Sequence, residues 1–341
     1  MLPLFPNLLR RLTAPALLGA LLAVGAQAAP KFKVGTLVPV GTSAHKALMK
    51  MGEAWRKDSA GAVDLNIFAG GKLGGEAEMV GLMKVNSLQG ALLTAVGLSE
   101  IEQSVTGLQN IPMGFRDLDE VDYVGEKLRP LLEKRMAAKG FVVLFWADAG
   151  WVRFFSNRPV VHPADLQKLK LFTWSGSPET VALYKSAGFD SVPLETVDIV
   201  PSLQTKLIDA VPTIPFFAMA AQIDSRAPYM LDLNWAPLVG AFVVRLETWN
   251  KFPAETREAL LKSAEIAGQE IKAISRREMS ESVVAMQKRG LKVTPVTPEI
   301  EAEWRKTAEV VYPKIRGPIV PPDIFDETLR VLAEYRAGQN K

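Results

Sequence analysis

The sequence contains no cysteine and only two histidines, His45 and His162, among its 341 residues. The absence of cysteine excludes disulfides, thiol nucleophiles and cysteine-ligated metal sites. Two histidines far apart in the sequence do not form the clusters on which many metal sites and acid–base pairs depend. We therefore expect a protein that binds neither a metal ion nor another cofactor.

Long hydrophobic runs are also scarce, and the clearest one lies at the N-terminus. Arg10 and Arg11 precede the apolar run Ala14–Gly25, and Ala26-Gln27-Ala28 has the small-x-small pattern of a cleavage site. This order is typical of a secretory signal peptide. The run is shorter than the roughly 20 apolar residues that a membrane-spanning helix needs. We predict a signal peptide over residues 1–28, cleavage near Ala28, and a soluble periplasmic product; the export route stays open.

An excess of positive charge is missing as well. The whole chain carries a formal net charge of +3, and removal of Arg10 and Arg11 with the signal peptide lowers it to +1. Nucleic-acid binding proteins present a basic surface, so no nucleic-acid partner is expected.

Enzyme motifs are absent too. There is no G-x-S-x-G nucleophile elbow, and the glycine-rich run Gly70–Gly75 lacks the G-K-[S/T] ending of a phosphate-binding loop. An exported enzyme, such as a hydrolase on a similar fold, is the alternative from another functional class. These absences favour a protein that is not an enzyme.

What the sequence does contain is an alternation of short apolar runs and amphipathic helices. Strands separated by helices predict βαβ units, a largely parallel sheet and an α/β fold. Residues 29–341 are more than one core usually supports, which favours two lobes. The strands are expected at Lys33–Leu37, Val63–Phe68, Leu88–Ala95, Phe141–Trp146, Val152–Ser156, Leu169–Thr173, Leu207–Val211, Tyr229–Leu233 and Ala241–Leu246.

The C-terminal hundred residues differ in kind. From Pro253 to Gly290 no further proline interrupts a helical pattern, in which Gly268 is the weak point. Because no heptad with charged flanks persists, we predict one very long helix that packs across both lobes rather than a coiled coil. Two more helices are expected, at Pro298–Tyr312 and Asp323–Arg336.

Six segments, in this order, resemble the DctP-type substrate-binding proteins of TRAP (tripartite ATP-independent periplasmic) transporters. Each segment is weakly specific alone, and the resemblance rests on their order and spacing over about residues 32–315. The segments are PVGTSAHKAL (39–48), FAGGKLGGEAEMV (68–80), NIPMGFRDLDEVDYV (110–124), FFSNRPVVHPADLQKLKL (154–171), PLETVDIVPSLQTKLIDA (193–210) and VVYPKI (310–315).

The resemblance implies a clamshell of the periplasmic binding protein type (type II-like), with hinge strands and a small organic solute enclosed between the lobes. It assigns residues 29–150, with part of 242–290, to lobe I, and residues 151–241, with part of 291–341, to lobe II. It also implies that the closed form docks transiently on the membrane subunits of a TRAP transporter. A receptor for an ABC importer or a sensor kinase is an alternative with the same architecture.

The sequence departs from the family pattern at the position where a substrate carboxylate is usually bound. The family places an arginine in the strand after the Asp-Leu turn, and here that position is Phe172. An asparagine expected after Asp209 is also missing, and Thr213 is the nearest match. A carboxylate buried beside phenylalanine without a donor costs several kcal/mol of desolvation, roughly 2–7 kcal/mol for an uncompensated polar group alone.

Aromatic residues surround the departure. Besides Phe172 they are Trp174, Phe216, Phe217 and Trp235. Each tryptophan could equally be a core residue. We predict that the cleft prefers an apolar, aromatic or uncharged solute.

Three further residues are candidates for ligand contact. Arg153 lies one residue away from the position at which many members of the family carry a second arginine. Because successive side chains of a strand point to opposite faces, this shift turns the Arg153 side chain to the other face. It either holds a carboxylate in place of the missing arginine or forms a hinge salt bridge. Glu76 could accept a hydrogen bond from a ligand hydroxyl or could stabilise a helix N-terminus. His45 is either a ligand contact or a surface or capping group.

Overall fold

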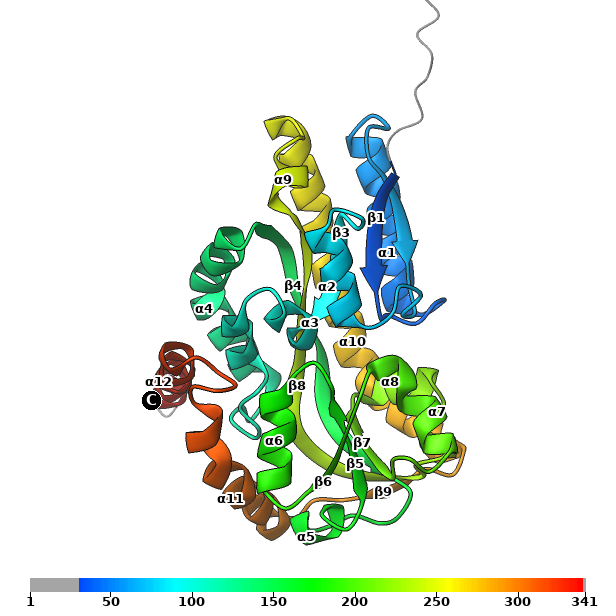
Figure 1. Ribbon diagram of the computed structural model, residues 1–341, viewed down its shortest axis with the longest axis vertical. Coiled ribbons are helices and arrows are strands. Elements are labelled where there is room, and N and C mark those ends of the chain that lie inside the picture. Colours follow the sequence, from blue (N-terminus) through cyan, green and yellow to red (C-terminus); the bar gives the residue numbers. More distant parts are fainter. Residues whose placement is uncertain (1–30, 340–341) are drawn as a thin grey trace, which may run out of the picture.

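A computed structural model describes residues 31–339, so the predicted signal peptide lies outside the described residues. The chain forms two lobes around one nine-stranded sheet with the strand order β2-β1-β3-β8-β4-β7-β5-β6, and β9 pairs with β8 (Figure 1). The strands are β1 Lys31–Thr36, β2 Asp64–Phe68, β3 Gly90–Thr94, β4 Phe141–Ser156, β5 Lys170–Trp174, β6 Asp190–Leu194, β7 Ala210–Thr213, β8 Tyr229–Arg245 and β9 Lys292–Thr294.

Helices cover both faces of the sheet, as expected for an α/β fold. The α-helices are α1 Ser43–Asp58, α2 Glu76–Lys84, α3 Ala95–Ser99, α4 Leu118–Ala138, α5 Pro163–Leu166, α6 Pro178–Ser186, α7 Ile199–Gln204, α8 Pro215–Ala220, α9 Leu246–Trp249, α10 Ala254–Lys288, α11 Pro298–Ile315 and α12 Pro322–Gln339. The short 3₁₀ helices are η1 Gln103–Leu108, η2 Thr196–Asp198 and η3 Ile223–Ser225. Below, lobe I denotes the elements from β1 to α4 and lobe II the elements from α5 to η3.

Two long antiparallel strands, β4 and β8, run through both lobes and connect them. Here the sequence prediction was wrong, because it divided each of them into two separate strands. β4 pairs with β8 from Phe141↔Arg245 to Ser156↔Tyr229, with register shifts between Val143 and Phe145, Asp148 and Trp151, and Val152 and Phe154. A β-bulge bends a strand without ending its pairing, so β4 and β8 continue from one lobe into the other through these register shifts.

The long helix α10 confirms the prediction of one helix across both lobes. Near its start, Leu260 and Ala264 pack in a core with Trp55 of α1, whereas Met286 near its end packs with Phe172 of lobe II. The weak point Gly268 is a packing site, since a Cβ there would lie 2.6 Å from the Phe145 ring.

Other elements differ in extent or were not predicted. The predicted strand Leu207–Val211 begins later, at Ala210, because Lys206 has a left-handed φ of 58° and Leu207 is exposed in the turn that follows. β6, β9, α8 and η1 were not expected. All four are short, with three to six residues each, so they offer little periodicity to read.

The two C-terminal helices lie on different lobes. α11 packs against α5 and α6 of lobe II, and α12 packs against α4 and η1 of lobe I. The turn between them, residues 315–321, is called the elbow below. It joins the two lobes on the side opposite α1 and α7 (Figure 1).

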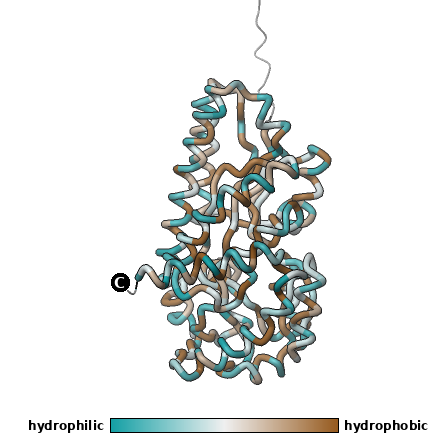
Figure 2. The backbone as a smooth tube through the Cα atoms, turned by 90° about the vertical axis from the view of Figure 1, so that its left-hand side faces the viewer, coloured by the Kyte–Doolittle hydropathy of each residue, from teal (hydrophilic) through white to brown (hydrophobic). Residues whose placement is uncertain are grey.

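The apolar residues concentrate along the central strands, whereas the outer helices alternate between apolar and polar residues (Figure 2). Within residues 31–339, no helix is both long and apolar enough to cross a membrane.

Candidate ligand-binding site

A cavity of about 640 Å³ lies between the lobes. Lobe I contributes Glu76 and Thr94 to its lining, lobe II contributes Phe172 and Trp174, and α10 contributes Ile271. Its volume falls in the range that encloses a drug-sized ligand. The position between two domains is a common one for ligand sites.

One end of the cavity is aromatic. Phe172 and Trp174 come from β5, and Phe216 and Phe217 come from α8. Pro215 is the first residue of α8, a position that proline favours, so a single turn of helix presents both phenylalanines to the cavity. Phe172 is only 7% exposed and packs with Ile199. The sequence prediction thus names the four side chains that the structure brings together as this aromatic end.

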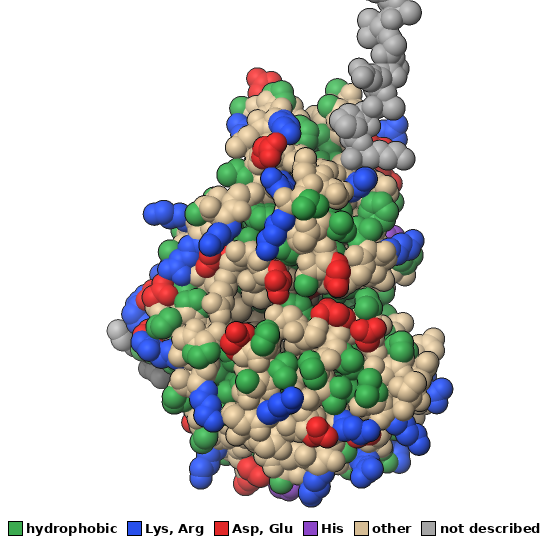
Figure 3. Space-filling model, viewed as in Figure 1, with side chains coloured by type: hydrophobic (Ala, Val, Ile, Leu, Met, Phe, Trp, Pro, Cys, Tyr) green, Lys and Arg blue, Asp and Glu red, His purple; other side chains and the backbone are tan. Residues whose placement is uncertain are grey.

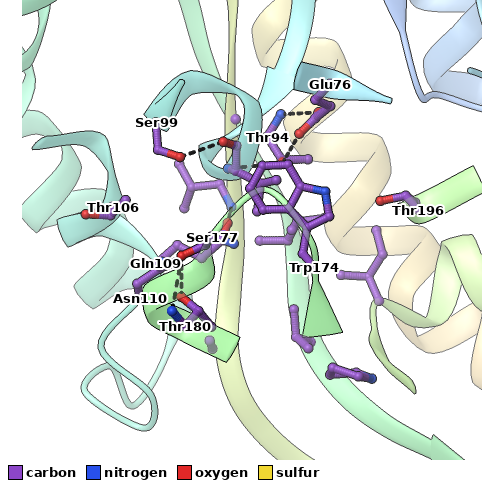
Figure 4. Close-up of a pocket in the computed structure, with 18 of the residues that line it drawn as sticks. Glu76, Thr94, Ser99, Thr106, Gln109, Asn110, Trp174, Ser177, Thr180 and Thr196 are labelled. Atoms are coloured by element: carbon purple, nitrogen blue, oxygen red, sulfur yellow. Dashed lines mark hydrogen bonds between the residues drawn. The ribbon is translucent and has the colours of Figure 1, made fainter. Parts of the chain in front are cut away.

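A polar region lies on the other side of Trp174 from Thr196 (Figure 4). Ser177 is the N-cap residue of α6, and its Oγ donates to Oγ1 of Thr180 at 2.7 Å. Asn110 of lobe I lies next to this pair (Figure 4). Among the described residues, no side-chain hydrogen bond to the Asn110 amide is present. The amide is thus available to a ligand.

Sequence reasoning did not identify Asn110 as a site residue. The signal was present, because Asn110 begins the N-I-P-M-G-F passage on which the family resemblance partly rests. The passage reads as a loop, and only the packing of lobe I against α6 brings it to the cavity.

Trp235 lines the cavity on the α6 and α11 side of the sheet. Its ring lies 5.3 Å from Phe154 and 5.9 Å from Trp304, measured between centroids. Tyr184 of α6 also lines the cavity, and burial raises the pKa of its phenol. Trp235 is therefore both a core residue and part of the cavity wall.

The lining is acidic where it is charged. Within residues 31–339, the side chains that line the cavity include four carboxylates, Glu76, Glu100, Asp148 and Glu179, but no lysine, arginine or histidine. Acidic side chains also gather on the surface where the two lobes meet (Figure 3). A ligand carboxylate would find no cationic partner here.

Two of the four carboxylates are occupied by the protein itself. Glu76, at the start of α2, is 2% exposed and accepts hydrogen bonds from the Thr94 N–H at 2.7 Å, the Thr94 hydroxyl at 2.6 Å and the Gly97 N–H at 2.9 Å. Burial raises the pKa of Glu76, these hydrogen bonds oppose the rise, and the nearby Glu195 adds to it. Its oxygens therefore orient α3 within lobe I.

Asp148 is the second occupied carboxylate. It is 5% exposed and accepts hydrogen bonds from Arg276 of α10, with Nη2 2.7 Å from Oδ2. The same guanidinium binds Asp122 of α4 at 2.6 Å. This ion-pair network ties α10 to the bend of β4 at the hinge.

Arg153, the candidate replacement for the missing arginine, does not line the cavity. It forms an ion pair with Asp232 of β8, and its Nη2 lies 3.5 Å from Oδ1 of Asn234. Burial lowers the pKa of Arg153, and Asp232 opposes this effect. The guanidinium is thus engaged on the hinge strands.

His45 and Thr213 do not line the cavity either. Nδ1 of His45 accepts a hydrogen bond from the Gly41 N–H at 3.3 Å, at the start of α1. Thr213 pairs with Arg153 in the register of β7 and β4.

The lobes touch each other beside the aromatic end. Glu195 of lobe II accepts hydrogen bonds from Ser175 and, at 3.2 Å, from Nε1 of Trp174. A Cβ added to Gly75 of lobe I would collide with the Glu195 carboxylate. The structure is therefore a closed arrangement in which the two lobes are in contact at this point.

A comparison with known protein families identifies the family that has this architecture. The family model for bacterial extracellular solute-binding protein family 7, DctP, matches residues 34–317. The chain belongs to this family. It is a DctP-type TRAP solute-binding protein that binds small organic solutes, and it is not an enzyme.

Relatives with curated names are distant but cover most of the chain. The 2,3-diketo-L-gulonate-binding periplasmic protein YiaO of Escherichia coli is 24% identical over 275 residues, which are 78% of this chain and 81% of the relative. The C4-dicarboxylate-binding periplasmic protein DctP of Rhodobacter capsulatus is 23% identical over 310 residues, which are 90% of this chain and 92% of the relative.

Solved structures share the fold. A sugar acid binding protein of Advenella mimigardefordensis in complex with galactonate superposes with a TM-score of 0.84 at 15% identity, over 90% of this chain and 98% of that one. A TRAP solute-binding protein of Shewanella oneidensis with bound succinate gives a TM-score of 0.83 at 18% identity, over 89% of this chain and 100% of that one. The two-lobed DctP fold with a long helix across both lobes is thus confirmed.

Proposed function

We propose that this DctP protein is the extracytoplasmic receptor of a TRAP transporter and that it captures an apolar, aromatic or otherwise uncharged solute. The observation that carries the proposal is the described cavity lining, which combines four aromatic side chains at one end with no lysine, arginine or histidine. The solute would be enclosed by lobe closure and delivered to the membrane subunits.

The position of the chain in the cell and the division into lobes belong to the same proposal. Residues 1–28 serve as the signal peptide, cleavage occurs near Ala28, and the protein works in the periplasm. Lobe I comprises residues 29–150 with part of 242–290, and lobe II comprises residues 151–241 with part of 291–341. The curated relatives named above are periplasmic proteins, which supports export.

An organic acid is the second candidate ligand. The names of the relatives favour it, since they include a C4-dicarboxylate-binding protein and structures with galactonate and succinate. Against it, a carboxylate enclosed without a cationic partner pays a large desolvation cost. Arg153 would have to leave Asp232 to serve as that partner.

A thermal-shift screen separates the two candidates. The full chain is expressed with its own N-terminal segment, purified from the periplasmic fraction, and freed of bound ligand by unfolding and refolding. A ligand at a hundred times its dissociation constant adds roughly 2.7 kcal/mol of stability, which raises Tm by several degrees.

We expect hits among neutral alcohols, ketones, amides and aromatic compounds and none among C4-dicarboxylates and sugar acids. Hits among the acids alone would contradict the proposal. In that case Arg153→Gln tests whether Arg153 binds the carboxylate in place of the missing arginine. If it does, the variant should no longer bind the acids. Recovery of the chain in the cytoplasmic fraction, uncleaved, would contradict the proposed export.

A further inference from the structure

The cavity has a second end, opposite the aromatic one, where it reaches the elbow. Ile315 and Ile319 of the elbow line it, together with Val311 of α11 and Leu183 of α6. Figure 4 shows Thr106, which lines the same end, and Thr196 of the aromatic end on opposite sides of Trp174. The cavity therefore extends from Thr106 past Trp174 to Thr196.

Polar groups at the elbow end are already used within the protein. Nε2 of Gln103 donates to the Pro318 carbonyl at 2.8 Å, and the Thr106 hydroxyl donates to the Ile319 carbonyl at 2.9 Å. The Thr307 hydroxyl donates to the Glu303 carbonyl at 3.0 Å. The bonds of Gln103 and Thr106 fix the elbow to lobe I, and the side chains of Leu183, Val311, Ile315 and Ile319 give this end of the cavity an aliphatic surface.

Resting on the proposed function, we infer that the elbow end is an apolar subsite for the tail of an elongated, uncharged ligand, such as an alkyl chain or an aliphatic ring. A compact polar solute would leave this end of the cavity without a partner. An apolar tail would instead bury its surface against Leu183, Val311 and Ile315.

The subsite also contributes to closure. Leu183 belongs to α6 of lobe II and Val311 to α11, which packs against lobe II, whereas the hydrogen bonds of Gln103 and Thr106 attach the elbow to lobe I. A tail at this place contacts a surface assembled from both lobes. A ligand that contacts both lobes favours the closed state over the open one.

The test uses the primary alkanols from butan-1-ol to nonan-1-ol as probes, with dissociation constants measured by calorimetry on the refolded full-length mature protein. We expect the affinity to rise by about fourfold for each added methylene group, as burial of a CH₂ group predicts. Val311→Trp fills the elbow end, so it should abolish the rise in affinity for the longer alkanols.

The neighbouring Val310 supplies a matched control. It lies on the same helix and is 70% exposed, so Val310→Trp should leave the whole series as in the wild type. If Val311→Trp lowers Tm by more than the control does, Leu183→Phe is the second variant. In Leu183→Phe the affinity should stop rising at a shorter alkanol than in the wild type.

An affinity that does not depend on the chain length of the alkanol would contradict the proposed subsite. A Val311→Trp variant that binds every alkanol as the wild type does would contradict it as well. If neutral compounds bind without this dependence, only the subsite fails. If organic acids bind and no alkanol does, the proposed function fails with it.

Discussion

Phe172 stands where the family resemblance leads one to expect an arginine that binds the substrate carboxylate. It is buried in β5 and forms part of the cavity wall. A hydrogen bond between charged groups is worth roughly 1.5–3 kcal/mol, so the loss of a bidentate pair removes most of the affinity for a small acid. A phenyl ring offers an apolar face in exchange. The proposed preference of the cleft for an uncharged ligand thus rests strongly on this one position.

Phe172→Leu is expected to weaken the binding of a neutral aromatic probe, 1-N-phenylnaphthylamine, by about two- to tenfold. The physical reason is the loss of one aromatic contact, worth roughly 0.5–1.5 kcal/mol. Fluorescence titration of the variant against the wild type measures the change.

Phe155→Leu is the control for this substitution. Phe155 packs in the same core cluster as Phe172 but does not line the cavity, so its substitution should lower stability and leave probe affinity unchanged. Equal losses of affinity in both variants would show that the aromatic wall is not the cause.

At the scale of elements, α12 is held on lobe I by a buried ion pair. Nε of Arg336 lies 2.7 Å from Oε1 of Glu120, and the Glu120 side chain is 2% exposed. Burial raises the pKa of Glu120, but hydrogen bonds from Arg336 and the Arg116 N–H outweigh burial and lower it overall. α12 in turn positions the elbow that closes the cavity.

Arg336→Gln is expected to lower the free energy of unfolding by about 3 kcal/mol at pH 7, because removal of one partner leaves a buried charge uncompensated. The pKa of Glu120 is lowered in the folded state, so the stabilisation is present above its ordinary value of 4.5 and is lost as the pH falls through the lowered pKa. The difference in the free energy of unfolding between wild type and variant, measured with urea, should therefore become smaller below pH 4.5.

Arg330→Gln provides the control for the ion pair. Arg330 lies on the same helix, but its side chain is 58% exposed, so its pairs with Glu327 and Glu334 are worth about 1 kcal/mol or less. If Arg330→Gln loses as much stability as Arg336→Gln, the loss comes from changes on the helix surface in general and not from the buried ion pair.

In the proposed function the whole molecule works by closing, and the contact between Gly75 and Glu195 is a place where closure can be tested. Gly75 has a φ of −74°, so an alanine there fits the backbone. Its Cβ would nevertheless displace the Glu195 carboxylate, which accepts hydrogen bonds from Trp174 and Ser175 within lobe II.

Gly75→Ala is expected to weaken ligand binding by about two- to tenfold, since the closed state loses hydrogen bonds worth roughly 0.5–1.5 kcal/mol each and the open state does not. Small-angle scattering should show a larger radius of gyration for the ligand-bound variant than for the ligand-bound wild type. Both quantities are measured with the strongest ligand from the neutral screen.

Gly81→Ala is the matched control in the same helix. A Cβ at residue 81 meets no atom within 4 Å, so this substitution should raise stability by about 0.5–1 kcal/mol, as alanine does in a helix interior, and leave both affinity and size unchanged. An unchanged affinity in Gly75→Ala would contradict the view that this contact forms on closure.

Much of this molecule was determined by the sequence itself. The α/β alternation is local, and the period of α10 is carried by its own residues, such as Leu260, Ala264 and Ile271. The aromatic residues of β5 and α8 were also identified from the sequence, because the resemblance aligns β5 with the strand of the missing arginine. Features of this kind need no knowledge of distant contacts.

The tertiary structure alone decided the rest. Whether β4 and β8 end or continue between the lobes depends on pairing between segments about 100 residues apart, such as Phe145↔Phe242. The engagement of Arg153 with Asp232, the place of Asn110 beside α6 and the elbow end of the cavity all require elements that only folding brings together. Side-chain type can be read from a sequence, but the partner that each side chain meets is set by long-range packing.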